Sequence, residues 1–150
     1  MNNKIISAFI AIFTIILSLS SCDKVEEEII SINNLPTAAQ TTINSSFDAE
    51  QISLITYEKD FLDHEYTVLF IDGTSIDFNK NGEWETIKSN VTGVPSSVMP
   101  SKIAEYLSNN YADYKVTEIE KDNNNYDVTL SQLIELTFNS SGELIGADID

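Results

Sequence analysis

Two stretches of the chain carry apolar residues at every fourth position, namely Leu35, Ala39, Ile43 and Phe47, and Met99, Ile103, Leu107 and Tyr111. Residues at this spacing lie on one face of an α-helix, so each set forms an apolar stripe. Pro36 and Pro100 stand near the starts of the stretches, and proline is tolerated in the first turn of a helix. The sequence therefore predicts two helices, one in each half of the chain.

After each predicted helix the apolar residues change to every second position. Tyr126, Val128 and Leu130 alternate with polar residues, and Leu136 and Phe138 continue the alternation. Such alternation is typical of half-buried strands. Hairpin turns are predicted where glycine follows a small polar residue, at Asp72-Gly73, Asn81-Gly82 and Ser141-Gly142. Each half therefore reads as one helix followed by four antiparallel strands.

The order of elements recurs, which indicates an internal repeat. Matched positions at one constant offset include Tyr66 and Tyr126, Phe78 and Phe138, and Gly82 and Gly142. We expect an α+β fold of two tandem repeats, over residues 34–89 and 93–150, each with one helix followed by a four-stranded antiparallel sheet. The pattern leaves open whether the two sheets join.

The motifs of both halves, in order, are Leu-Pro or Val-Pro, a helix, Tyr-x-Val-x-Phe or Leu, and then Phe-Asn-x-x-Gly-Glu. Across residues 34–150 this order resembles the PepSY-like domains of the β-lactamase-inhibitor-protein-like group. The resemblance implies paired PepSY-like repeats on a small exported lipoprotein that binds or inhibits another protein. The shared motifs are structural, so no catalytic residue is carried over.

The N-terminus reads as an export signal. Lys4 precedes an almost wholly apolar stretch at 5–19, and small residues follow it up to Cys22. The apolar run is shorter than the roughly 20 residues of a transmembrane helix. Residues 19–22 resemble the lipobox of bacterial lipoproteins, which implies a signal peptide at 1–21 and acylation of the Cys22 thiol. A free thiol is the alternative.

Cys22 is the only cysteine, so a disulfide within the chain is excluded. The segment 22–33 is expected to be a lipidated acidic tether, with Glu26, Glu27 and Glu28 either as a hydrated spacer or as an export tag of the kind found in some bacterial groups. The expected location is the bacterial outer membrane, on its periplasmic face or at the cell surface.

The charge of the chain is strongly negative. It has 24 acidic residues, 8 lysines and no arginine, for a net charge of −16. Without residues 1–21, which hold one lysine and no acid, the charge is 7 − 24 = −17. Nucleic acids are excluded as partners because binding them requires basic residues that neutralise phosphates. A basic partner and a simply solvated surface both fit this charge.

Candidate catalytic and metal-binding residues are few. His64 is the only histidine, in a predicted loop between Asp63 and Glu65. A zinc site needs several His or Cys ligands, and a nucleophile needs a positioned base. We therefore expect a non-enzymatic protein with no catalytic residue, no metal and no cofactor, and a solvated His64.

One stretch matches the opening of a calcium loop. Asp77, Asn79, Asn81 and Gly82 follow the pattern D-x-N-x-N-G, but Lys88 occupies the position of the closing acid. A strand-to-strand turn with glycine at a positive φ explains the same residues.

The loop before Tyr66 is four residues longer than the loop before Tyr126, and it carries Phe61 and Leu62 at its expected tip. Exposed apolar residues on a hairpin tip can mark a contact site, whereas the alternative is that they fold back on the sheet. The candidate partner-binding residues are Phe61, Leu62, Asp63 and His64.

These observations predict an exported, lipid-anchored, non-enzymatic binding module in the cell envelope. Its expected partners are the membrane, through Cys22, and a protein or peptide that the sequence does not identify. Inhibition of a protein or hydrolase is the activity that the resemblance implies. The alternative is a structural envelope or surface lipoprotein with no discrete ligand.

Overall fold

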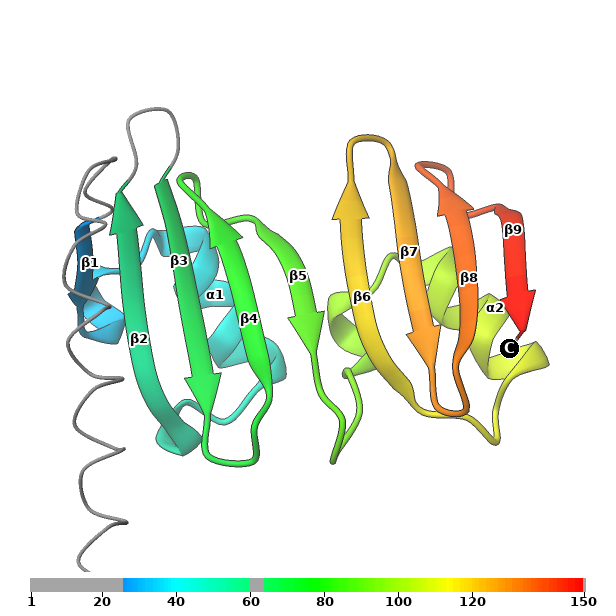
Figure 1. Cartoon of the computed structure of the whole chain (residues 1–150), viewed down its shortest axis with the longest axis horizontal. Helices are drawn as coiled ribbons and strands as arrows, with labels where there is room; N and C mark the ends of the chain where they lie inside the picture. The colour runs from blue at the N-terminus through cyan, green and yellow to red at the C-terminus, as the bar shows by residue number, and fades with distance from the viewer. Residues whose placement is uncertain (1–25, 60–63, 150) are drawn as a thin grey trace, which may run out of the picture.

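The computed structural model describes residues 26–59 and 64–149, which form one nine-stranded antiparallel sheet and two short helices (Figure 1). Neighbours in the sheet are neighbours in the chain, from β1 at one edge to β9 at the other. The helices are α1 (Thr37–Ser46) and α2 (Ser101–Asn110). The strands are β1 (Glu26–Ile29), β2 (Ile52–Lys59), β3 (His64–Phe70), β4 (Ser75–Asn79), β5 (Trp84–Lys88), β6 (Val116–Asp122), β7 (Asn125–Leu130), β8 (Ile134–Asn139) and β9 (Leu144–Ile149).

The predicted fold class, two tandem repeats that each carry a four-stranded sheet, is wrong. β5 pairs with β6 through the partners Ile87 and Ile119 and one pair on either side, so the strands form a single sheet. β1, from the acidic segment 22–33, adds a further strand against β2. The physical reason is that separate sheets would leave β5 and β6 as edges with unpaired backbone groups, which pairing satisfies.

One row of buried side chains crosses the sheet and unites its core. Each of the strands β2 to β8 contributes one aliphatic residue, and each residue is the register partner of the next. All are at most 4% exposed. The row consists of Ile55, Val68, Ile76, Ile87, Ile119, Val128 and Leu136.

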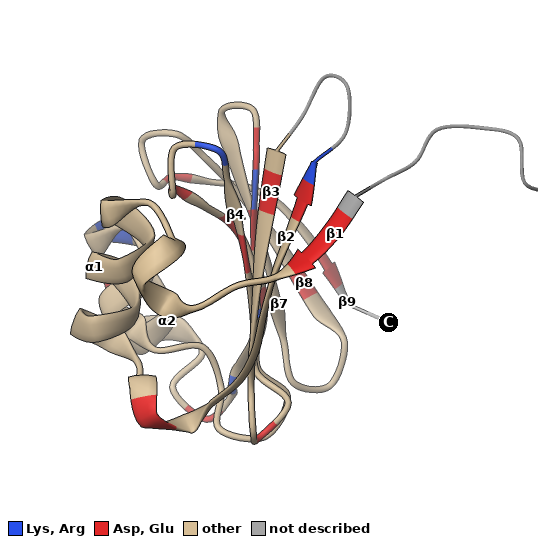
Figure 2. Cartoon of the chain, turned by 90° about the vertical axis from the view of Figure 1, so that its left-hand side faces the viewer, with Lys and Arg blue, Asp and Glu red and all other residues tan. Residues whose placement is uncertain are grey.

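Both helices lie on one side of this sheet (Figure 2). The predicted helices are confirmed, because the middle residues of the stripes, Ala39 and Ile43 in α1 and Ile103 and Leu107 in α2, are buried in the core. The end residues of the stripes, Leu35, Phe47, Met99 and Tyr111, lie just outside the helices. Within the described parts of the chain, neither helix is long and apolar enough to cross a membrane. The fold is therefore a two-layer arrangement in which the helices cover one face of the sheet.

Candidate functional site

The face of the sheet opposite the helices is the candidate functional site, and we call it the open face. No described helix covers it (Figure 2). Successive side chains of a strand point to opposite sides of a sheet, so the residues between the core positions lie here. Register partners on this face run from Leu54 and Thr56 through Leu69, Thr67, Asp77, Ser75, Lys88, Thr86, Glu118, Glu120, Asp127, Thr129, Glu135 and Thr137.

The half of the open face formed by β6, β7 and β8 is a shallow acidic hollow of about 260 Å³. Four carboxylates line it, from Glu118, Glu120, Asp127 and Glu135. The other side of these strands carries the buried residues Ile119, Val128 and Leu136, so folding of the core brings the negative charges together. The hollow favours positively charged groups.

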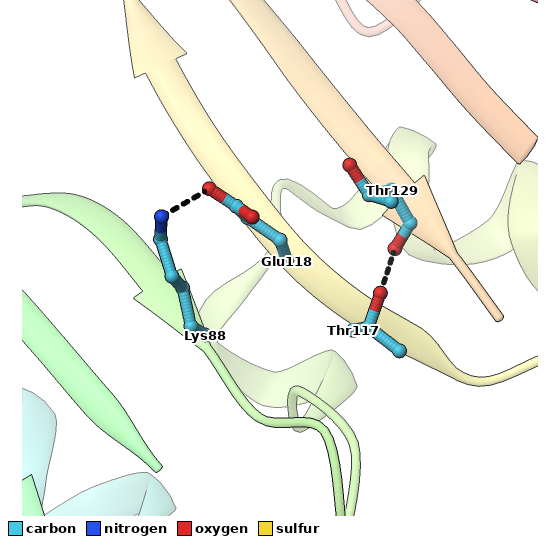
Figure 3. Close-up of polar contacts among 4 residues, drawn as sticks. All are labelled: Lys88, Thr117, Glu118 and Thr129. Atoms are coloured by element: carbon cyan, nitrogen blue, oxygen red, sulfur yellow. Dashed lines mark hydrogen bonds and ion pairs between the residues drawn. The ribbon is translucent and has the colours of Figure 1, made fainter. Parts of the chain in front are cut away.

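One lysine reaches this hollow from the neighbouring strand. The ammonium of Lys88 on β5 lies 3.0 Å from a carboxylate oxygen of Glu118 on β6 (Figure 3). The hydrogen bond and charge of Glu118 raise the pKa of Lys88, and the charges of Asp77 and Glu120 add to the effect. Lys88 therefore stays protonated, and within the described residues the other acids of the hollow have no ion-pair partner.

Threonine hydroxyls hold two carboxylates of the open face in place. Thr67 donates to Asp77 at 2.9 Å, and Thr137 donates to Asp127 at 2.7 Å, each across neighbouring strands. The hydroxyl of Thr117 donates to the backbone carbonyl of Thr129 at 3.2 Å, across β6 and β7 (Figure 3). The acidic surface is thus ordered by short cross-strand hydrogen bonds.

The half of the open face formed by β1, β2 and β3 carries an apolar cluster, beside the polar pairs Thr56–Thr67 and Glu58–Glu65. Leu54 and Leu69 are direct register partners and are each 37% exposed. Ile71 follows Leu69 by two residues and Ile29 lies on the edge strand, and both are exposed. An apolar patch beside a charged region is a common composition for a protein contact surface.

Of the predicted site residues, the structure describes His64 alone. Cys22 and the tip residues Phe61, Leu62 and Asp63 lie outside the described residues. The prediction that His64 is a solvated loop residue is wrong, because His64 is the half-buried first residue of β3. Its ring nitrogen Nδ1 lies 2.7 Å from the hydroxyl of Tyr57, and the two rings meet edge to face at 5.7 Å. Strands β2 and β3 are longer than the sequence predicted, so His64 forms part of the sheet.

The residues that match a calcium loop form a hairpin turn. The Asn79 side-chain oxygen accepts from the backbone N–H groups of Asn81 and Glu83, at 3.0 and 3.1 Å, and Gly82 has a φ of +79°. Asn139 makes the equivalent contacts in the second half. Asp77 is not part of this arrangement, because its carboxylate lies on the open face. Among residues 26–59 and 64–149, no three acidic, His or Cys side chains are placed to hold a metal ion.

Sequence reasoning missed the open face. Unbroken apolar runs such as Val68-Leu69-Phe70 were a signal, because a strand with one buried face would alternate apolar and polar residues. Leu69 lies between two buried residues and therefore has to point to the other side of the sheet. The acidic hollow left no such signal, since its members are dispersed over three strands.

A family described as "Putative beta-lactamase-inhibitor-like, PepSY-like" matches the chain over residues 64–146. This match confirms the resemblance that the motifs predicted. No curated protein matches the chain.

The solved structures similar to this chain include three from Bacteroides. A "putative calcium-regulated periplasmic protein" from Bacteroides thetaiotaomicron is 36% identical, with a TM-score of 0.75, over 81% of this chain and 96% of that one. A "putative periplasmic protein" from Bacteroides vulgatus is 33% identical, with a TM-score of 0.75, over 82% and 97%. A second "putative periplasmic protein of unknown function" from Bacteroides vulgatus is 30% identical, with a TM-score of 0.72, over 82% and 99%.

Proposed function

Because this chain belongs to the PepSY-like, β-lactamase-inhibitor-like family, we propose that it is an exported, non-enzymatic binding module that holds a protein partner against its open face. The observation that carries the proposal is the composition of this face. Leu54 and Leu69 form an apolar centre on one half, and the carboxylates of the hollow form an acidic region on the other. Apolar anchors beside charged residues are the usual anatomy of protein interfaces.

The charge of the open face specifies the chemistry of the partner. Complementary charge increases association rates and disfavours wrong partners. A partner with lysine or arginine side chains opposite Glu120, Asp127 and Glu135, and with apolar residues opposite Leu69, fits both halves of the face. If that partner is a hydrolase, binding would inhibit it, because a bound domain of this size would obstruct substrate access.

We also propose that Cys22 is the lipid anchor and that the protein is an outer membrane lipoprotein, on the periplasmic face or at the cell surface. The support is the signal-like segment at 1–21, together with relatives described as periplasmic. Mass spectrometry of the protein from a bacterial envelope should give a mature N-terminus at Cys22 with added acyl mass. Cleavage at another site, or an unmodified thiol, would contradict the anchor.

No metal is part of the proposal, although one relative is described as calcium-regulated. In this chain the residues of the calcium-like motif form a turn, with the Asn79 side chain engaged by backbone groups. The proposal therefore assigns the open face to protein contact alone.

Two variants with the same chemical change test the binding function. Leu69→Asn alters the apolar cluster of the open face, whereas Leu133→Asn alters an exposed leucine in the β7–β8 turn, at a φ of +58° that asparagine tolerates. Envelope extracts should yield one stoichiometric partner with the wild type and Leu133→Asn, and little with Leu69→Asn. The captured partner, purified, should bind the wild type directly and more weakly as salt concentration rises.

The results separate the proposal from its alternatives. A partner that Leu69→Asn retains would place binding elsewhere on the molecule. Absence of a stoichiometric partner would favour the alternative function, a structural envelope or surface lipoprotein with no discrete ligand.

A further inference from the structure

A cleft of about 390 Å³ opens on the helix side of the sheet, where the two halves of the chain meet. We call it the helix-side cleft. Its size falls within the range of pockets that bind small molecules. Its walls come from α1, the β4–β5 turn, the segment before α2, and strands β5 to β7. The lining residues are Ala38, Thr42, Gly82, Glu83, Trp84, Val98, Met99, Pro100, Lys121 and Tyr126.

Two aromatic side chains form the apolar surface of the cleft. The rings of Trp84 and Tyr126 lie 6.2 Å apart between centroids, at an angle of 48°. Both are half-buried, and both pack against the core cluster. Each ring therefore has one side fixed by the protein and part of its surface left to the cleft. Such rigid aromatic surfaces bind planar apolar groups.

The cleft also contains a cation without a carboxylate partner. Lys121 is the register partner of Tyr126, so the two side chains lie on the same side of the sheet. Among the described residues the one ion pair joins Lys88 to Glu118, on the opposite face. The ammonium of Lys121 is therefore available to an anion.

The start of α2 adds a second positive group at the rim. Pro100 lines the cleft and precedes the first residue of the helix, and no side chain caps the N-terminal N–H groups. These groups and the positive end of the helix dipole favour a negative charge. Glu83, the acid of the cleft, directs its carboxylate to the side chain of Asn79 at 3.3 Å.

We propose that the helix-side cleft binds a small organic anion with a planar apolar body. The anionic group contacts Lys121, and the planar body lies against the exposed sides of Trp84 and Tyr126. This binding is separate from partner binding, since the open face and the cleft lie on opposite sides of the sheet.

The chain offers a reporter for this cleft alone. Trp84 is the only tryptophan, so its indole N–H gives a single side-chain signal in a ¹⁵N–¹H correlation spectrum. The probe is 2-naphthoate, and its neutral counterpart is 2-naphthalenemethanol. The Trp84 signal should shift saturably with 2-naphthoate. The neutral compound should bind roughly tenfold more weakly, because it lacks the charge-assisted contact.

Two matched variants test the role of the lysine. Lys121→Met keeps the aliphatic stem and removes the charge, and should weaken naphthoate binding roughly tenfold. Lys80→Met makes the same change in charge in the nearby β4–β5 turn, outside the cleft lining, and should leave binding unchanged. The proposal is wrong if the acid and the alcohol bind equally, if Lys121→Met binds as the wild type does, or if the Trp84 signal does not saturate.

Discussion

A substitution at Gly82 tests how the β4–β5 turn is fixed against α1. Gly82 has a φ of +79°, and an added Cβ would lie 2.7 Å from the Pro36 Cβ and 2.9 Å from the Ala39 backbone nitrogen. Gly73, in the β3–β4 turn, has a similar φ of +84° but no atom within 4 Å of an added Cβ. The two glycines therefore share the conformational constraint and differ in packing.

The expected effects follow from these contacts. A non-glycine residue in the left-handed region costs about 1–2 kcal/mol. Alanine also lowers the conformational entropy of the unfolded chain, which offsets about 0.4–1 kcal/mol of this cost. Gly73→Ala should therefore reduce the free energy of unfolding by about 1 kcal/mol. Gly82→Ala should add a steric cost of about 1–3 kcal/mol, since backbone and ring atoms cannot move aside easily.

Equilibrium denaturation with urea, monitored by circular dichroism, measures both variants against the wild type. The difference between the two variants, about 1–3 kcal/mol, is the decisive quantity because the conformational term cancels. Equal destabilisation by Gly82→Ala and Gly73→Ala would show that the turn does not pack on α1, and would refute the account of the hairpin motif as a helix-contacting turn.

Three further predictions concern the core at the junction of the two halves, the ion pair across it and the β3–β4 turn. Ile87→Ala should lower the free energy of unfolding by about 2–5 kcal/mol while leaving one cooperative transition in denaturation, whereas two transitions would indicate separately folding halves. In a double-mutant cycle with Lys88→Met and Glu118→Gln, the coupling energy should be about 0.2–1 kcal/mol and should fall with added salt, because both side chains are partly exposed. The Thr74 backbone N–H holds the pKa of Asp72 below its ordinary value of 3.8, so the ionised group stabilises the fold above that value. The stability advantage of the wild type over Asp72→Asn should therefore be constant near neutral pH and shrink as pH falls through the pKa of the folded state; an advantage that grew in acid would contradict this.

The parts of the fold that the sequence predicted depend on local interactions. The stripes containing Ile43 and Ile103 predicted the helices because residues one turn apart on a helix share one face, which is a local property of the sequence. The turn at Gly82 was predictable because its φ restricts the residue type. The pairing of Ile87 with Ile119 was not, since a long connection containing α2 separates the two strands. The sequence of either strand alone does not show whether that strand lies at the edge of a sheet or pairs with a further strand.

Strand β1 was missed for a related reason. Glu26, Glu27 and Glu28 read as a solvated charged run, yet these residues form an edge strand against β2. Charged residues on an edge strand discourage pairing with another chain. The same acidic sequence therefore fits both a tether and a protected edge. The pairing of this segment with β2, for example of Glu28 with Tyr57, distinguishes the two.

The junction of β5 and β6 also explains why neither candidate surface could be predicted as a whole from the sequence. On the open face, Lys88 from the first half contacts Glu118 from the second. On the helix side, Trp84 from the first half meets Tyr126 and Lys121 from the second. The apolar cluster of the open face lies in the first half and the acidic hollow in the second, so only the joined sheet presents both on one face. The continuous sheet fixes these groups on a rigid support, which lowers the entropic cost of binding. The pairing of β5 with β6 that overturns the predicted fold class is thus the feature that creates both candidate sites.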